Sequence, residues 1–201
     1  MAVQRAFKWG ARQGYLEASP VEHLEKPMAE RRDNCPTKED YEVIMAAVND
    51  CFRDVLEFAW ISGARPQEIM AMEDRHIEGD KVIFPVHESK GKKRKRVIYL
   101  TDRAKELVTG RRGYVFKNRR GGKWNAFNVN NRMCRLAKKT GKKFALVDFR
   151  HAFATRMLES GLDHLTVAKL MGHADASMLA KHYSHIGEKN DYLLEQLRRA
   201  S

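Results

Sequence analysis

The sequence has few cysteines and no long apolar run. Its three cysteines, Cys35, Cys51 and Cys134, stand far apart among 201 residues, and no CxxC pair occurs. An odd, scattered set argues against a disulfide framework or a zinc site and favours the reducing cytoplasm. No apolar run approaches the ~20 residues that a membrane span needs, and the N-terminus lacks a signal-peptide pattern. We therefore expect a soluble cytoplasmic protein that does not associate with a membrane.

Several catalytic motifs are absent as well. There is no GxxxxGK(S/T) loop, so ATP-driven chemistry has no support. There is no HExxH motif, no dense group of acidic residues at metal-ligand spacing and no GxSxG elbow. The remaining candidate for chemistry is a phosphate site of Arg, Lys, His and Tyr side chains that needs neither a metal nor a cofactor.

Acidic residues are outnumbered, and the basic residues cluster. The chain has 38 Lys and Arg against 26 Asp and Glu, which gives a formal net charge of +12. A polyanion is the partner that such a charge favours, and nucleic acid is the commonest polyanion. Six of the seven residues from 90 to 96 are basic. A charge run of this kind is more often a solvated segment or a localisation signal, so its setting decides between these interpretations.

The setting of the basic run predicts a β-hairpin. Residues 81–86 (KVIFPV) and 96–100 (RVIYL) are β-branched and aromatic strand candidates, and Gly91 supplies a turn between them. A basic hairpin tip can lie along a phosphate backbone. We expect DNA contacts from Lys92, Lys93, Arg94, Lys95 and Arg96. Residues 114–116 (YVF) are the candidate for a third strand.

Most of the remaining sequence has the spacing of short helices. Thr37 is a typical N-cap because acidic residues follow it, and the run after Phe52 is apolar nearly all round, as in a buried core helix. Predicted helices cover about residues 37–48, 52–61, 66–72, 101–110, 128–139 and 190–200, with two or three more between 147 and 185. We expect a mainly helical α+β fold with a small antiparallel sheet of about three strands at one edge.

The helix predicted at 128–139 has one basic side. Val129, Met133 and Leu136 are predicted to face inward. The other side carries Arg132, Arg135, Lys138 and Lys139. Such a face fits a DNA groove, although a solvated face is equally common. Arg132 and Arg135 are therefore candidate DNA contacts.

Polar residues at helix ends form the candidate active site. Gly161 and Gly172 break the helical pattern between 147 and 185, and Arg150, His173 and Tyr183 fall near such breaks, where side chains can converge. An Arg, a His and a Tyr together suggest a phosphate to be held and an oxygen to attack it.

Arg65 stands at another helix start. It follows a turn at Gly63 and precedes Pro66, which suits the first helical position. Glu68, three residues on, can brace it. The simpler explanation for an isolated arginine here is a surface residue that caps the helix or pairs with Glu68.

Five segments occur in the order of a known family. They are SGARPQEI, ESKGKKRKRVIYL, DFRHAFATRML, LMGHADAS and HYSH, and together they resemble the catalytic domain of the tyrosine recombinases, the phage integrase family. The resemblance implies catalytic roles for Arg65, Lys90, Arg150, His173 and Tyr183, with Lys93 as the fallback for Lys90. It implies site-specific recombination of double-stranded DNA through a 3′-phosphotyrosine, without a cofactor. It also implies a homotetramer on DNA, although the fragment alone is expected to be monomeric.

The resemblance also divides the chain. Residues 37–201 correspond to the catalytic domain, with a C-terminal helix at 190–200 that would dock on a neighbouring subunit. Residues 1–27 resemble the last helix of the core-binding domain that precedes it, stopped at Ser19 and Pro20, and residues 28–36 read as a linker.

One position departs from the family pattern. The family commonly has a polar residue three positions before the second arginine, and this chain has Val147, which can neither accept a proton nor donate a hydrogen bond. His151 lies one helical turn further on and can face the same way, although a structural hydrogen bond is its simpler role. A DNA-binding domain with weakened or lost catalysis is therefore the alternative function. A type IB topoisomerase shares the chemistry, but the integrase-like segments favour a recombinase.

Overall fold

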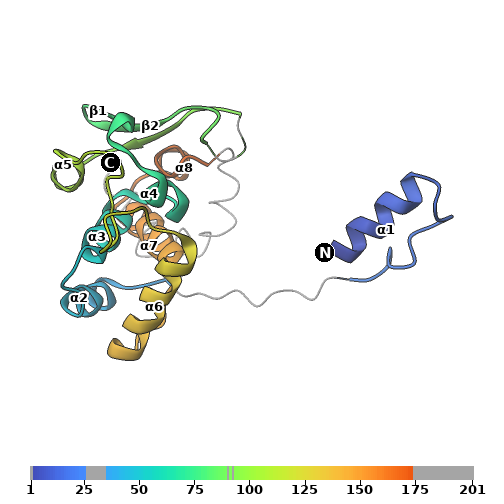
Figure 1. Ribbon diagram of the computed structural model, residues 1–201, viewed down its shortest axis with the longest axis horizontal. Helices are drawn as coiled ribbons and strands as arrows, with labels where there is room; N and C mark the ends of the chain where they lie inside the picture. Colours follow the sequence, from blue (N-terminus) through green and yellow to red (C-terminus); the bar gives the residue numbers. More distant parts are fainter. Residues whose placement is uncertain (1, 26–34, 90, 92, 174–201) are drawn as a thin grey trace, which may run out of the picture. The chain divides into compact units, whose positions relative to one another are not determined.

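The computed structural model describes residues 2–25, 35–89, 91 and 93–173 (Figure 1). The chain divides into two compact units, residues 1–33 and 34–201. The division falls within the segment 28–36 that reads as a linker. Within the described ranges, no helix is both long enough and apolar enough to cross a bilayer.

Among residues 2–25, which are the described part of the first unit, there is one helix, α1 (Ala2–Arg12). The prediction that this helix continues to Ser19 and Pro20 was wrong. The chain turns at Gly14, which has φ of 78° and so takes a left-handed conformation that favours glycine. The turn stacks the ring of Tyr15 on that of Trp9, with the centroids 5.8 Å apart.

The second unit is mainly helical, as predicted. Its helices are α2 (Lys38–Ala46), α3 (Phe52–Ser62), α4 (Pro66–Ala71), α5 (Asp102–Val108), α6 (Ala126–Thr140), α7 (Leu146–Glu159) and α8 (His164–Met171). A short 3₁₀ turn, Asp74–His76, follows α4. Thr37 caps α2, since its hydroxyl accepts a hydrogen bond from the Asp40 amide at 3.2 Å. The predicted helix starts at Thr37 and Pro66 are confirmed.

A three-stranded antiparallel sheet lies at one edge of this unit (Figure 1). The predicted hairpin is confirmed as β2 (Lys81–Phe84) and β3 (Arg96–Tyr99), with Val82 opposite Ile98. The third strand is β1 (Ile77–Glu78), and not residues 114–116 as predicted. Val115 and Phe116 are instead buried in the core, where the Phe116 ring lies 5.1 Å from that of Phe58. Their apolar character reflects packing on α3 rather than strand pairing.

The core surrounds α3, whose Phe52, Val55, Leu56 and Phe58 are fully buried, as predicted. Helix α7 runs beside α3 (Figure 1). A second, smaller apolar cluster joins the end of α7 to α8 through Phe153, Leu158, Val167 and Met171. Burial of such side chains is the main force that holds one helix on another. It fixes the C-terminal end of α8 beside α4 and the hairpin, where the candidate site lies.

Candidate active site

Arg65 is held at the start of α4 by the local sequence. Gly63 ends α3 in a left-handed conformation with φ of 59°, and Pro66 begins α4. Glu68 accepts hydrogen bonds from the Arg65 amide at 2.9 Å and from Arg65 Nη1 at 2.7 Å. The expected contact between Arg65 and Glu68 is therefore present, and it fixes the direction of the guanidinium.

Glu68 is a charged carboxylate between two arginines. Its Oε1 also accepts a hydrogen bond from Arg96 Nε at 3.3 Å. Burial alone would raise the pKa of Glu68, but the charge of Arg96 and the hydrogen bonds from Arg65 hold this pKa below its ordinary value. Glu68 thus stays ionised and joins Arg65 and Arg96 into one network.

Three guanidinium groups meet the last carbonyls of α8. Arg96 Nη1 donates to Leu170 O at 3.0 Å, Arg150 Nη2 to Met171 O at 2.7 Å, and Arg65 Nη2 to Gly172 O at 2.9 Å. The final carbonyls of a helix have no partners within it and carry the negative end of its dipole, so they are natural acceptors for cations. Three consecutive peptides therefore gather arginines from three different elements.

The same helix end positions His173. Gly172 takes a left-handed conformation with φ of 65°, and the His173 amide turns back to donate to Ala168 O at 2.9 Å. Burial, followed by the charges of Arg150, Arg65 and Arg96, lowers the pKa of His173 to about 4. The imidazole is neutral at neutral pH, and its buried Nδ1 has no hydrogen-bond partner among the described residues.

An open pocket of about 440 Å³ lies in front of these groups. Arg65 and His173 line it on the helical side, and Lys93, Arg94 and Lys95 line it on the hairpin side. Arg150 is only 5% exposed and is not among the lining residues. It lies behind the pocket wall, where Nη1 also donates to Gly63 O at 2.6 Å. The pocket thus combines strong positive charge with a neutral imidazole, a combination suited to a phosphate group.

The model of the Phage integrase family matches residues 36–190, which include this pocket. The chain belongs to the phage integrase family. Tyrosine recombinase XerC of Pseudomonas entomophila is 26% identical over 205 residues, which cover 92% of this chain and 67% of that protein. XerC of Xanthomonas axonopodis pv. citri is 30% identical over 200 residues, covering 92% and 65%. The chain thus spans about two thirds of the length of these curated relatives.

Solved structures show the same fold. The integrase of transposon Tn1549, in complex with a circular intermediate DNA, has a TM-score of 0.71 at 15% identity and covers 98% of this chain and 76% of its own. A lambda integrase tetramer bound to a Holliday junction has a TM-score of 0.69 at 19% identity and covers 88% and 56%. The predicted fold, a tyrosine recombinase catalytic domain, is confirmed. Family membership favours an active DNA-cleaving and rejoining enzyme, and the alternative of lost catalysis gains no support over it.

The position of the Arg96 side chain in this recombinase differs from the exposed position that the sequence predicted. This residue was expected to contact DNA from the hairpin surface, but its side chain is only 6% exposed. Successive strand residues point to opposite faces of a sheet, and in β3 Arg96 shares the inward face with Ile98. Its guanidinium is directed at Glu68 and α8, and Arg96 lines the wall of the pocket beside Arg65 and His173.

The remaining predicted site residues either lie outside the described part of the chain or are exposed on α7. Lys90, Lys92 and Tyr183 lie outside the described residues. Val147 is 41% exposed and His151 is also exposed, one turn apart on α7. His151 is among the groups whose charge lowers the pKa of His173, which places it in the electrostatic surroundings of the site.

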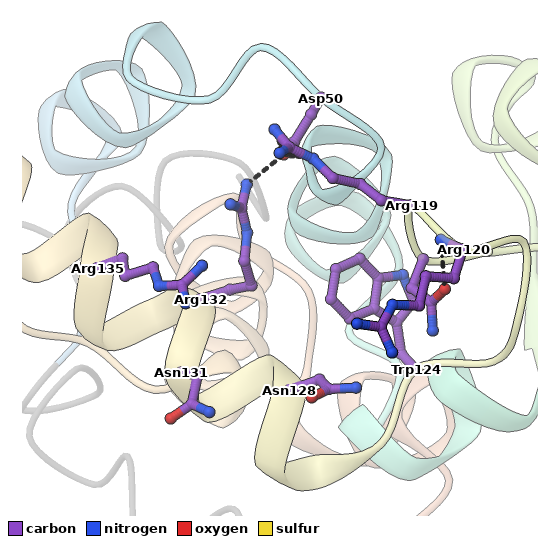
Figure 2. A pocket seen from close by; sticks show the side chains of 9 residues that line it. Asp50, Arg119, Arg120, Trp124, Asn128, Asn131, Arg132 and Arg135 are labelled. Atoms are coloured by element: carbon purple, nitrogen blue, oxygen red, sulfur yellow. Dashed lines mark hydrogen bonds and ion pairs between the residues drawn. The ribbon is translucent and has the colours of Figure 1, made fainter.

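A second basic pocket of about 390 Å³ lies along α6 (Figure 2). Asp50 pairs with Arg132 Nη2 at 2.5 Å and with Arg119 Nη2 at 2.8 Å. Arg132 is therefore partly buried and paired, whereas Arg135 is exposed. The sequence of residues 118–125 (NRRGGKWN) indicates only a loop or turn, and Arg119 and Arg120 were not among the predicted site residues. The signal available was two adjacent arginines before a Gly-Gly turn.

Proposed function

We propose that this recombinase domain cleaves one DNA strand with Tyr183 as nucleophile while Arg65, Arg150 and His173 stabilise the scissile phosphate. The observation that carries this proposal is the gathering of Arg65, Arg150 and His173 at the end of α8, beside a pocket lined by the basic hairpin. These groups come from α4, α7, α8 and the hairpin, so their convergence is a property of the fold. Tyr183 and Lys90 complete the site on the basis of the resemblance.

The chemistry is covalent nucleophilic catalysis. The Tyr183 phenolate, formed by loss of its proton to solvent, attacks phosphorus, the bond to the 5′-oxygen breaks, and Lys90 gives that oxygen a proton. The products are a 3′-phosphotyrosine and a 5′-hydroxyl. Because one phosphate ester replaces another, the bond energy is retained, and a 5′-hydroxyl can reverse the step to rejoin DNA.

The arginines and the histidine take different parts in this scheme. Arg65 lines the pocket and can bind the non-bridging oxygens, whose charge grows as the phosphorane forms. Arg150 adds positive charge from behind the wall, and the neutral His173 supplies a hydrogen bond. Positive charge also favours ionisation of a phenol, whose pKa is ~10 when free. Lys93 remains the fallback for Lys90.

Double-stranded DNA is the proposed partner. The hairpin residues Lys92, Lys93, Arg94 and Lys95 would follow one backbone segment, and the second pocket, with Arg132 and Arg135, would contact another. We propose that the recombinase acts in the cytoplasm as a tetramer on DNA, with residues 190–200 docking between subunits. This chain without DNA is expected to be a monomer. Residues 37–201 would be the catalytic domain, and residues 1–27 the end of a core-binding domain.

The test is trapping of the covalent intermediate. The protein is incubated with a library of nicked suicide substrates, and protein–DNA adducts are separated on a denaturing gel. We expect an adduct that Tyr183→Phe abolishes and that Arg65→Ala reduces by about 10²-fold or more, the range for loss of one charge-stabilising donor. A DNA shift on a native gel, with no adduct at any protein concentration, would instead support the binding-module alternative.

A further inference from the structure

Arg96 is a buried arginine that joins three elements of the active site. It begins β3, yet its side chain is only 6% exposed. Its Nε donates to Glu68 on α4 at 3.3 Å, and its Nη1 donates to Val97 O at 2.5 Å and to Leu170 O on α8 at 3.0 Å. A buried guanidinium is costly unless such partners compensate it. The fold therefore maintains this charge at a specific point.

The end of α8 packs directly on Arg96. A Cβ atom added to Gly172 would lie 2.5 Å from Arg96 Nη1 and 2.8 Å from its Cδ, so no larger residue fits without movement. The carbonyl of this same Gly172 accepts the hydrogen bond from Arg65, and His173 is the next residue. Arg96 thus supports the peptide that orients both Arg65 and His173.

Arg96 also sets the charge balance at Arg65. Glu68 Oε1 lies 2.7 Å from Arg65 Nη1 and 3.3 Å from Arg96 Nε, so one carboxylate is shared by two guanidiniums. The three groups together carry a net charge of +1. Without Arg96, Arg65 and Glu68 would form a neutral pair, and Arg65 would attract a phosphate less strongly.

From these contacts we propose that Arg96 is a positioning residue of the active site, which holds Glu68 and the end of α8 so that Arg65 and His173 face the scissile phosphate. This inference rests on the proposed function, because its main readout is DNA cleavage. It replaces the surface DNA contact that the basic run suggested for Arg96. Arg96 lines the wall of the pocket beside Arg65 and His173, and we infer that its effect on cleavage comes through Arg65, Glu68 and the end of α8.

The experiment separates the rate of cleavage from DNA affinity. Arg96→Met is the main variant, since methionine is apolar and roughly fills the space of the buried stem. Single-turnover adduct formation is measured at saturating protein, and the Kd is measured on a native gel. We expect the rate on bound DNA to fall about tenfold or more, because small displacements of catalytic groups can cost as much as ~10²-fold. The Kd is expected to change less than about twofold, as for a residue without contact to DNA.

Two other arginines provide the contrasts. Arg94→Met removes a charge from the hairpin side of the same pocket and should raise the Kd for DNA by more than Arg96→Met does. Arg103→Met removes an exposed charge that pairs with Glu57 and Glu106 and that lines neither pocket, so it should change neither quantity. Wild-type cleavage of bound DNA by Arg96→Met, or a loss of affinity like that of Arg94→Met, overturns the inference.

A measurement without DNA gives an independent readout. In protein with isotopically labelled histidines, the pKa of His173, about 4 in the wild type, should rise toward its ordinary value in Arg96→Met. If the wild type forms no adduct, the proposed function fails while this titration still tests the role of Arg96. If Arg96→Met does not fold, Arg96→Lys decides, because one ammonium cannot span all three acceptors. Full wild-type cleavage and an unchanged His173 titration in Arg96→Lys would overturn the proposal.

Discussion

Gly63 offers a sharp test of how the site is built. Its φ of 59° is in the left-handed region, and an added Cβ would lie 2.4 Å from Cδ1 and 2.8 Å from Cγ of Phe153. Phe153 belongs to the buried cluster between α7 and α8, so its ring cannot swing into solvent. The Gly63 carbonyl also accepts the hydrogen bond from Arg150 Nη1. Gly63→Ala therefore combines backbone strain, a steric clash and displacement of an active-site anchor.

The expected magnitude follows from two separate costs. A left-handed conformation costs a residue with a Cβ about 1–2 kcal/mol. Forcing an extra methyl group into a packed core adds about 1–3 kcal/mol. Gly79 has nearly the same φ, 57°, but an added Cβ there meets nothing within 4 Å. Gly79→Ala is thus a matched control that carries only the first cost, and the difference between the two variants should be about 1–3 kcal/mol.

The assay is urea unfolding of the whole chain, followed by tryptophan fluorescence, with the slope of the transition checked for equality among variants. Gly63→Ala should lower the free energy of unfolding by more than Gly79→Ala. Phe153→Ala, which removes the clashing ring atoms, should destabilise Gly63→Ala less than it destabilises the wild type. Cleavage of bound DNA should fall in Gly63→Ala and not in Gly79→Ala.

Equal destabilisation by Gly63→Ala and Gly79→Ala, within about 0.5 kcal/mol, would refute this reasoning. It would mean that Phe153 does not press on Gly63 and that the link from α3 to α7 is looser than the packing indicates. Unchanged cleavage despite a large loss of stability would refute the second part, the anchoring of Arg150 by the Gly63 carbonyl.

Three further predictions concern pH, the departure from the family pattern and the second pocket. His173 has a folded-state pKa of about 4, below its ordinary value, so the unfolded chain binds more protons between these values; stability should fall as pH drops through this window, and His173→Gln should reduce that pH dependence in urea unfolding. Val147→His should raise the cleavage rate at least several-fold, since a positioned acid or base contributes up to about 10²–10⁴-fold; an unchanged or lower rate would show that position 147 is not a missing helper. Arg135→Ala should weaken binding across DNA sequences and reduce the dependence of log Kd on log salt by about one, as for loss of one phosphate contact; an unchanged salt dependence would remove α6 from the interface.

The elements that sequence predicted well were those with strong local signals. Thr37 and Pro66 mark helix starts by their own chemistry, and Gly63 and Gly172 mark helix ends by their conformation. These signals act over one turn of chain, so no tertiary information is needed to read them. The prediction of where α1 ends also relied on a local signal, and it was wrong. In the sequence, Pro20 is the stronger signal for the end of a helix. In the structure, the turn at Gly14 and the stacking of Tyr15 on Trp9 end the helix earlier.

The prediction of the third strand failed because apolar character does not distinguish a residue that pairs in a sheet from one that packs in the core. Residues 114–116 are apolar since Val115 and Phe116 fill the core beside α3, whereas the true third strand, Ile77–Glu78, is too short to show a pattern. A two-residue strand pairs only because the turn at Gly79 brings it back onto β2. Neither fact can be read from one sequence without knowing what lies on each side of the sheet.

Arg96 shows where composition and fold diverge within a single charge run. By composition alone, residues 90–96 are one basic stretch, and each of its basic side chains is predicted to contact DNA. Read as a strand, Arg96 shares a face with Ile98, and that face is buried. Period-two alternation was available in the sequence, but an inward arginine makes sense only with a carboxylate and free carbonyls to receive it. Glu68 and Leu170 supply these from segments 28 and 74 residues away. The end of a helix is thus used twice, as a cap for buried cations and as the mount for His173, and only the assembled fold reveals that both uses depend on the same peptides.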